Sequence, residues 1–395
     1  MINIIMSLRN RKSKARLGRF NEILLSGAVI LIWCVSAHAQ TIDLSGQASG
    51  WVTVKRDDAH VGLRYIPELS LMKDLSETYT ISAEAAVNTR WSSRFEGSDH
   101  IGSTSAVDPY RLWVRFASPQ YEIRAGLQKI SFGSATLLRP LMWFDSIDPR
   151  DPLQLTNGVY GLLGRYYYPS NANIWMWALY GNDDLKGWET LPGDKREIEF
   201  GGRVQVPVLA GEMALSYHHR RVDPKASGFG AQHPSQGKFP EDRFGIDGKW
   251  DAGVGLWFEA TVTRRDIDVP EPTYQRLFTV GADYTFDLGN GPHLLFEQFV
   301  RGEAQNAFGS GKGNWLSALS IDYPLSVLDK VAAIVYYDWD RSEWSRLLQW
   351  QRTYDKWQVH MSAFWNPDRT SPTRDTAAIG SFAGKGVQLM LVFNH

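Results

Sequence analysis

The chain alternates apolar and polar residues over many short segments. Between residues 121 and 128, Tyr121, Ile123 and Leu127 take alternate positions with charged or polar neighbours such as Glu122 and Arg124. The same two-residue period returns in the segments 79–88, 111–116, 197–206 and 356–363. This period predicts β-strands with one apolar and one polar face, and a helical period does not fit these windows.

The connections between these segments alternate in length, which predicts a barrel. Roughly 18 segments are present, and they start near residues 41, 60, 77, 109, 120, 158, 171, 195, 211, 242, 253, 274, 292, 314, 328, 343, 356 and 385. Short turns lie at 118–120, 169–171, 207–211, 251–253, 287–292 and 354–356, and longer polar stretches lie at 92–107, 132–157, 181–194, 222–241, 303–313 and 367–384. We therefore predict an all-β fold, a transmembrane antiparallel β-barrel of about 18 strands with 16 as the fallback, short periplasmic turns and long extracellular loops. An even strand count puts both ends of the barrel on the short-turn side.

The aromatic content and the hydropathy agree with this prediction. The chain has 16 Trp, 16 Tyr and 18 Phe, yet its mean hydropathy is −0.30. Aromatic residues gather near the predicted strand ends, as in the run 166–168, where the girdles of a membrane barrel are expected. A soluble β-propeller or β-helix is the alternative, but no repeat of the length typical of those folds is visible.

The first residues predict an export signal. A basic stretch leads into an apolar run from about Ile23 to Ser36, which ends in Ala37, His38 and Ala39. The run is shorter than a membrane-spanning helix, so we expect residues 1–39 to be a cleaved signal peptide and residues 40–395 to be a single outer-membrane barrel domain. The single cysteine would be lost with the signal, which excludes disulfides and thiol chemistry from the mature chain.

Charge argues against a nucleic-acid partner. The chain has 42 basic and 43 acidic residues, and the predicted signal contains six of the basic residues and one of the acidic ones. The mature barrel is therefore expected to be acidic, without a polybasic face.

A short stretch resembles known porin-like families. Residues 124–133 contain a Gly-x-Gln strand that ends in an aromatic-Gly pair, and residues 145–152 form an Asp-Pro-x-Asp loop. This combination resembles porin-like barrels, including the alginate-export-like and general porin families. The resemblance implies a wide barrel with a charged lumen and one ordered loop near its mouth.

The segment 134–157 is the candidate constriction loop. It is rich in apolar residues between 137 and 144, which is unusual for a solvated loop. Folding into the lumen and packing across the extracellular rim are both open readings. Its charged residues are the constriction-loop candidates: Arg139, Asp145, Asp148, Arg150 and Asp151.

Strand parity selects the candidate residues for the lumen and its selectivity. They are Arg111, Arg115, Arg124, Arg165, Arg203, Glu84, Glu122, Glu197 and Glu199. The same parity puts Asp247, Glu259 and Glu297 on the inner face and Ile123, Leu127, Phe200 and Met361 on the lipid-facing side. Four of the arginines, Arg111, Arg115, Arg124 and Arg165, fall on three consecutive strands and predict a basic strip, which would act on ions through its field. An alternative is a wetted lumen without solute preference.

Motifs for catalysis and metal binding are weak. His360 and Ser362 have the spacing that puts both on one face of a strand, but the Asn-Gly expected after the serine in outer-membrane phospholipases is absent. His218 and His219 are adjacent, so their rings point to opposite faces of a strand. We predict no catalytic residues, metal site or cofactor.

The sequence thus predicts a non-enzymatic outer-membrane porin that passes small hydrophilic, charged solutes. The expected partners are outer-membrane lipid, small polar solutes and the barrel assembly machinery, which would recognise the C-terminal strand. The alternative functions are export of a charged polysaccharide, which requires a more uniformly basic lumen, and a structural or adhesive barrel with a plugged lumen.

Overall fold

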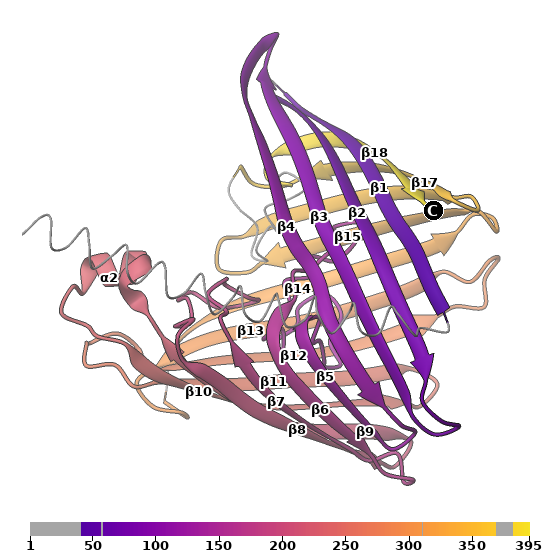
Figure 1. Cartoon of the computed structure of the whole chain (residues 1–395). Helices are drawn as coiled ribbons and strands as arrows, with labels where there is room; N and C mark the ends of the chain where they lie inside the picture. The colour runs from indigo at the N-terminus through magenta and orange to yellow at the C-terminus, as the bar shows by residue number, and fades with distance from the viewer. Residues whose placement is uncertain (1–40, 57, 310, 369–381) are drawn as a thin grey trace, which may run out of the picture.

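The computed structural model describes residues 41–395 except 57, 310 and 369–381, so the predicted signal peptide lies outside the described residues. The described part of the chain contains 18 strands and two short helical turns (Figure 1). The strands are β1 Thr41–Lys55, β2 Asp58–Asp74, β3 Thr80–Glu96, β4 Asp99–Ala117, β5 Tyr121–Gln128, β6 Val159–Tyr167, β7 Asn173–Tyr180, β8 Ile198–Val208, β9 Gly211–Val222, β10 Phe239–Asp251, β11 Gly255–Arg265, β12 Tyr274–Thr285, β13 His293–Ala304, β14 Lys312–Pro324, β15 Asp329–Asp338, β16 Glu343–Thr353, β17 Trp357–Trp365 and β18 Lys385–Asn394. The turns are η1 Pro224–Ala226 and α2 Gly228–Gln232.

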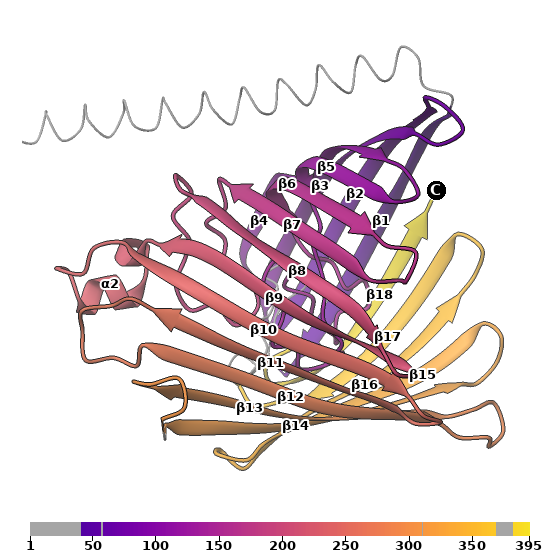
Figure 2. The ribbon, with the colours of Figure 1, turned by 90° about the horizontal axis from the view of Figure 1, so that it is seen from below.

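The strands form one closed antiparallel barrel. Each strand pairs with its neighbours in the chain, and β1 pairs with both β2 and β18. The ladder between the first and last strands continues to the final residue, because the backbones of Gly46 and His395 exchange hydrogen bonds of 3.1 and 3.0 Å. Figure 2 shows the sheet curving from β5 through β14 toward β18. The prediction of an 18-stranded barrel is confirmed.

Alternation along each strand gives the barrel an apolar outer face. On β17, Met361 is 53% exposed on the outside, whereas His360 and Ser362 are buried on the inside. Ile123 and Phe200 are likewise exposed, as the parity predicted. Leu127 was expected on the outer face as well, but it is only 4% exposed. The ladder is unbroken at this position, where Leu127 pairs with Leu112 and Tyr160, so its low exposure does not reflect a change of register.

The two rims of the barrel differ in the length of their connections. The rim that carries the short connections, here the short-turn rim, includes the turns after β4, β8 and β16. The opposite rim, the long-loop rim, carries the segments 129–158, 181–197 and 223–238. The end of β18 and the start of β1 both lie on the short-turn rim, as predicted. No helix among the described residues is long and apolar enough to cross a membrane.

One predicted loop is wrong. Residues 92–107 were expected to form a long polar loop, but they extend β3 and β4 into a long hairpin that rises above the neighbouring strands (Figure 1). The hairpin turns at Gly97, whose φ of 59° suits glycine. Residues 99–111 of β4 pair only with β3, because β5 is much shorter and pairs only with residues 112–117.

The outward face of β17 allows a direct test of the barrel register. Replacing Met361 by arginine puts a charge into the lipid-facing belt and is expected to lower the free energy of unfolding by roughly 2 to 4 kcal/mol. Replacing Gln358, an inward residue of the same strand, by arginine is expected to cost far less. Denaturant titrations in phospholipid vesicles measure both values, and equal losses would contradict the register.

Candidate functional site

The segment 129–158, here called the inner loop, crosses the lumen. Its apolar residues are buried: Leu138 is fully buried, and Ala135 and Leu137 are nearly so. They pack in one cluster with inward-facing side chains of the strands from β11 to β17, among them Trp257 and Phe299. The apolar content of the loop is therefore explained by burial inside the barrel, and of the two readings left open by the sequence the inward fold is the correct one.

Two glutamates of the barrel wall hold the inner loop. On β13, Glu297 accepts the backbone N–H groups of Thr136, Leu137 and Leu138 at 2.6–3.0 Å. On β11, Glu259 accepts those of Ala135 at 2.7 Å and Leu141 at 3.0 Å. Both glutamates are fully buried. Because charged acceptors form the stronger hydrogen bonds, these contacts fix the loop against the wall opposite its own strands.

Aromatic residues fill the other side of the inner loop. Phe132, Trp143 and Phe144 pack in a cluster with Trp177 of β7. The ring of Phe132 stacks on Trp177 with centroids 5.6 Å apart, and the ring of Phe144 meets His218 edge-on at 4.9 Å. The loop thus packs against both walls of the barrel.

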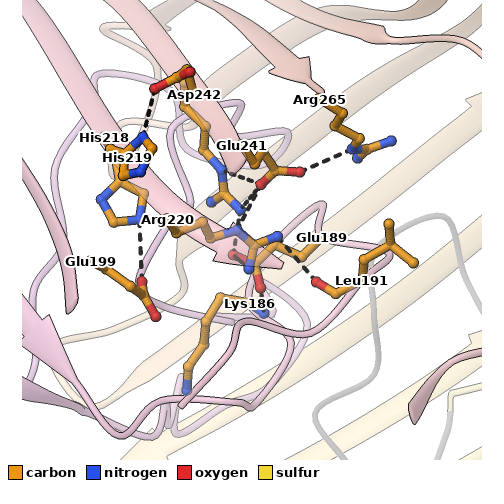
Figure 3. Close-up of polar contacts among 11 residues, drawn as sticks. Lys186, Glu189, Leu191, Glu199, His218, His219, Arg220, Glu241, Asp242 and Arg265 are labelled. Carbon is orange, nitrogen blue, oxygen red and sulfur yellow. Dashed lines mark hydrogen bonds and ion pairs between the residues drawn. The ribbon is translucent and has the colours of Figure 1, made fainter. Parts of the chain in front are cut away.

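A second loop, residues 181–197, adds to this layer (Figure 3). Glu189 forms ion pairs of 2.9 Å with Arg220 and 2.7 Å with Arg243. On β10, Glu241 pairs with both arginines at 2.7 Å. Trp188 stacks on Phe299 at 4.5 Å, and its Nε1 donates to the carbonyl of an inner-loop residue at 2.9 Å. The two loops and the wall are therefore joined into one structure.

A cavity of about 430 Å³ remains between the inner loop and the wall of β14, β15 and β16. Its loop side includes Thr136, Arg139 and Gln154, and its wall side includes Ser320, Asp322, Lys330, Gln349 and Gln351. Lys330 and Asp322 form an ion pair of 2.7 Å. Amides, hydroxyls and charges of both signs therefore face this space, which suits polar solutes and water.

The predicted basic strip exists on the inner wall of β4, β5 and β6. Arg124 Nη2 lies 3.1 Å from Glu122 Oε1, and Arg165 and Arg115 approach the same carboxylate at 3.5 and 3.7 Å. Three cations thus surround one anion, and the cluster retains positive charge. Arg111 lies on β4 nearer the long-loop rim than Arg115, and it donates to the carbonyl of Thr156 in the inner loop at 3.1 Å.

The other predicted lumen residues have different surroundings. Arg203 is buried in a bidentate ion pair with Asp247, at 2.5 and 2.9 Å. Glu199 is buried against His218 at 3.3 Å (Figure 3). Glu84 lies on the inner face of β3, where it pairs in register with Trp113 of β4.

Glu197 was expected in the lumen, but it is exposed in a turn before β8 begins. β8 begins only at Ile198, after the predicted start near residue 195, so the parity argument does not reach this position.

The charged residues of the inner loop are mostly paired with one another. Arg139 pairs with Asp145 at 2.9 Å, and Arg150 pairs with Asp148 at 2.6 Å. Asp145, Asp148 and Arg150 are at most 3% exposed. The acids therefore neutralise their neighbours in the loop and do not face the basic strip as free charges.

The remaining acid, Asp151, is buried opposite Arg64 of β2. It accepts the N–H of Leu153 at 2.9 Å and that of Leu155 at 3.4 Å. Burial raises its pKa to about 6, although the charge of Arg64 opposes this shift. A raised pKa means that the folded loop favours the protonated acid.

This shift gives the stability of the folded protein a defined pH dependence. The contribution of Asp151 is fully present below its unfolded pKa and is lost as the pH rises through about 6. We expect lowering the pH from about 7 to about 4 to favour the native chain over Asp151→Asn by up to roughly 3 kcal/mol. Thermal unfolding at several pH values measures this difference. The exposed turn variant Asp355→Asn is the control, and identical pH profiles of native chain and Asp151→Asn would contradict the prediction.

Sequence reasoning selected Arg139 and Asp151 on the loop side of the cavity but missed the residues of its wall. Gln349, Gln351 and Lys330 all lie on strands that were predicted, but parity only gave their side, and nothing in the sequence marked the wall that the loop leaves free. Glu259 and Glu297 were recognised as inward acids, but their role as loop anchors depends on the fold.

Catalytic and metal motifs acquire no new support. His360 and Ser362 both face inward, as parity predicted, and no hydrogen bond between them is present in the described part of the chain. No group of three metal-ligating side chains is found within residues 41–395 outside the undescribed gaps.

Comparison with known proteins places the fold. No family model and no curated protein matches the sequence. Among solved structures, the chain is similar to OmpT, an outer membrane protein of Vibrio cholerae, with a TM-score of 0.50 and 8% identity over 90% of this chain and 99% of that one. It is also similar to the anion-selective porin from Comamonas acidovorans, with a TM-score of 0.47 and 14% identity over 90% and 99% of the chains. A third similar structure is Salmonella typhi OmpF in complex with daunomycin, with a TM-score of 0.45 and 11% identity over 90% and 97%.

The closed sheet, the apolar outer face and the likeness to the Vibrio protein define the class of this chain. It has the fold of a porin-like outer-membrane β-barrel. In this class the short turns lie on the periplasmic side and the long loops on the outside of the cell.

Proposed function

We propose that the chain is a non-enzymatic channel for passive passage of small hydrophilic solutes, charged ones included. The observation that carries this proposal is the polar cavity of about 430 Å³ beside the inner loop. Burying Gln349, Gln351 and Lys330 in a packed core would be costly, whereas an open polar cavity leaves these side chains in contact with water.

The basic strip supports a role for charge in this passage. Arg115, Arg124 and Arg165 lie near the periplasmic ends of their strands, so they face a solute on the periplasmic side of the inner loop. A field of this kind changes the rate at which ions enter more than it binds them.

Single-channel recording in planar bilayers tests the proposal. A steady ohmic conductance and a reversal potential that differs from zero in a salt gradient are the expected results. Filling the cavity with Gln351→Trp is expected to reduce the conductance. Gln205→Trp, on the inner wall of β8 beside Arg203, provides a comparison outside the cavity. The complete absence of conductance from correctly folded barrels would overturn the proposal.

A barrel with a plugged lumen is the second candidate. The inner loop packs against both walls and is tied to Glu259 and Glu297, which favours this alternative. Recording from folded barrels separates the two, because a plug gives no current until the loop is released. Export of a charged polysaccharide receives less support, since charges of both signs occur on the inner wall.

A further inference from the structure

The outer face of the barrel carries a groove across β7 to β11. Its volume is about 640 Å³, and its lining is apolar. Outward-facing side chains such as Met176, Leu215 and Phe244 surround it, while Gly202 and Ala260 leave space between them. In the ladder, Gly202 lies opposite Tyr217, and Ala260 lies opposite Ile246. Tyr217 and Ile246 belong to neighbouring outward rows of β9 and β10, so the two small residues lie on the same part of the sheet.

A polar row lies directly beside this groove, toward the long-loop rim. Asp242 pairs in register with His219 on one side and Arg264 on the other. Its carboxylate accepts hydrogen bonds from Tyr217 Oη at 2.7 Å and from His219 Nδ1 at 2.8 Å. Arg264 itself is exposed. Arg221 is also exposed and lies two residues after His219 on β9, nearer the long-loop rim.

The groove faces the hydrocarbon of the outer leaflet, because it lies in the apolar belt and its polar row lies toward the outside of the cell. An empty hollow there would lose the dispersion contacts of its lining. An acyl chain supplies those contacts, and two exposed guanidinium groups at the upper end suit a phosphate on the same molecule. Asp242 is the acid of this row, and its Oδ1 atom is the one that Tyr217 and His219 contact.

We propose that this groove is a specific site for a phosphate-bearing lipid of the outer leaflet. One acyl chain lies over Gly202 and Ala260, and the phosphate contacts Arg221 and Arg264. The site does not involve the lumen, so a test of lipid binding does not depend on the proposed channel function.

Native mass spectrometry of the folded barrel, released from detergent after titration with diphosphoryl lipid A, tests the site. The expected result is one retained lipid A molecule and no retained phosphatidylcholine or inorganic phosphate. Arg221→Ala with Arg264→Ala is expected to weaken retention by at least about ten-fold. Arg346→Ala, an exposed arginine on the outer face of β16, is the matched control.

A second variant tests the apolar part of the site. Ala260→Trp fills the groove and is also expected to reduce retention, whereas Ala333→Trp on the outer face of β15 is not. Gel mobility of unheated samples checks that each variant is folded. Retention that both the arginine and the tryptophan variants leave unchanged would overturn the proposal. So would a dimer that forms through this face and that Ala260→Trp abolishes, because the occupant would then be a second copy of the chain.

Discussion

Replacing Glu259 and Glu297 together by alanine is expected to raise the single-channel conductance several-fold. The two carboxylates accept five backbone N–H groups of the inner loop. Each buried N–H left without an acceptor costs about 1 to 3 kcal/mol, so the docked loop would lose its advantage over a displaced one. Planar-bilayer recording measures the change, and a noisier open state is expected from a loop that moves within the lumen.

Two further variants separate the loop anchor from a general effect of charge. Glu303→Ala removes a glutamate from the same strand, but Glu303 is partly exposed and pairs with Arg301, so its loss should leave the conductance unchanged. Glu297→Gln keeps one acceptor oxygen and is expected to give an intermediate conductance. If the double alanine variant is folded and conducts like the native chain, the glutamates do not hold the loop in place.

Replacing Arg115 and Arg124 together by glutamate is expected to shift ion selectivity toward cations. Both arginines lie beside Glu122, so the substitution converts a cluster with excess positive charge into a strongly negative one. Unit charges about 4 Å apart interact by roughly 4 kcal/mol at an effective dielectric of 20, but only about 1 kcal/mol in water. The shift in reversal potential should therefore be largest at low salt and should shrink as salt screens the cluster.

The control for this prediction changes the same charge outside the lumen. Arg221→Glu with Arg264→Glu alters the outer face of the barrel, and it is expected to leave the reversal potential near that of the native chain. An unchanged potential in Arg115→Glu with Arg124→Glu would mean that ions do not pass the basic strip, and the pore should then be regarded as unselective.

The strands could be predicted because their pattern is local. Alternation gave the positions of β5, β8 and β17 to within a few residues, since a strand with one face in lipid must repeat every two residues. The start of β4 could not be predicted in this way. Residues 99–111 lie beyond the membrane belt, where no lipid imposes an apolar face, so their polar sequence resembled that of a loop.

The side of each residue could also be predicted, but its partner could not. Parity put Arg203 and Asp247 on the inner face, yet their mutual ion pair depends on which strands become neighbours. The apolar content of the inner loop indicated that it is buried somewhere. The place where the loop is buried depends on Glu259 and Glu297, which lie on distant strands, so the local sequence does not contain this information.

The anchoring of the inner loop also sets an order of events during folding. The hydrogen bond between Thr136 and Glu297 joins residues 161 positions apart, and loops of that length are slow to close. The strands from β1 to β9 can pair with one another before this contact forms. The loop cannot dock on Glu259 and Glu297 until β11 and β13 have joined the sheet. Until then Leu137 and Leu138 stay uncovered, so the partly assembled barrel is the stage at which this chain is most prone to aggregate.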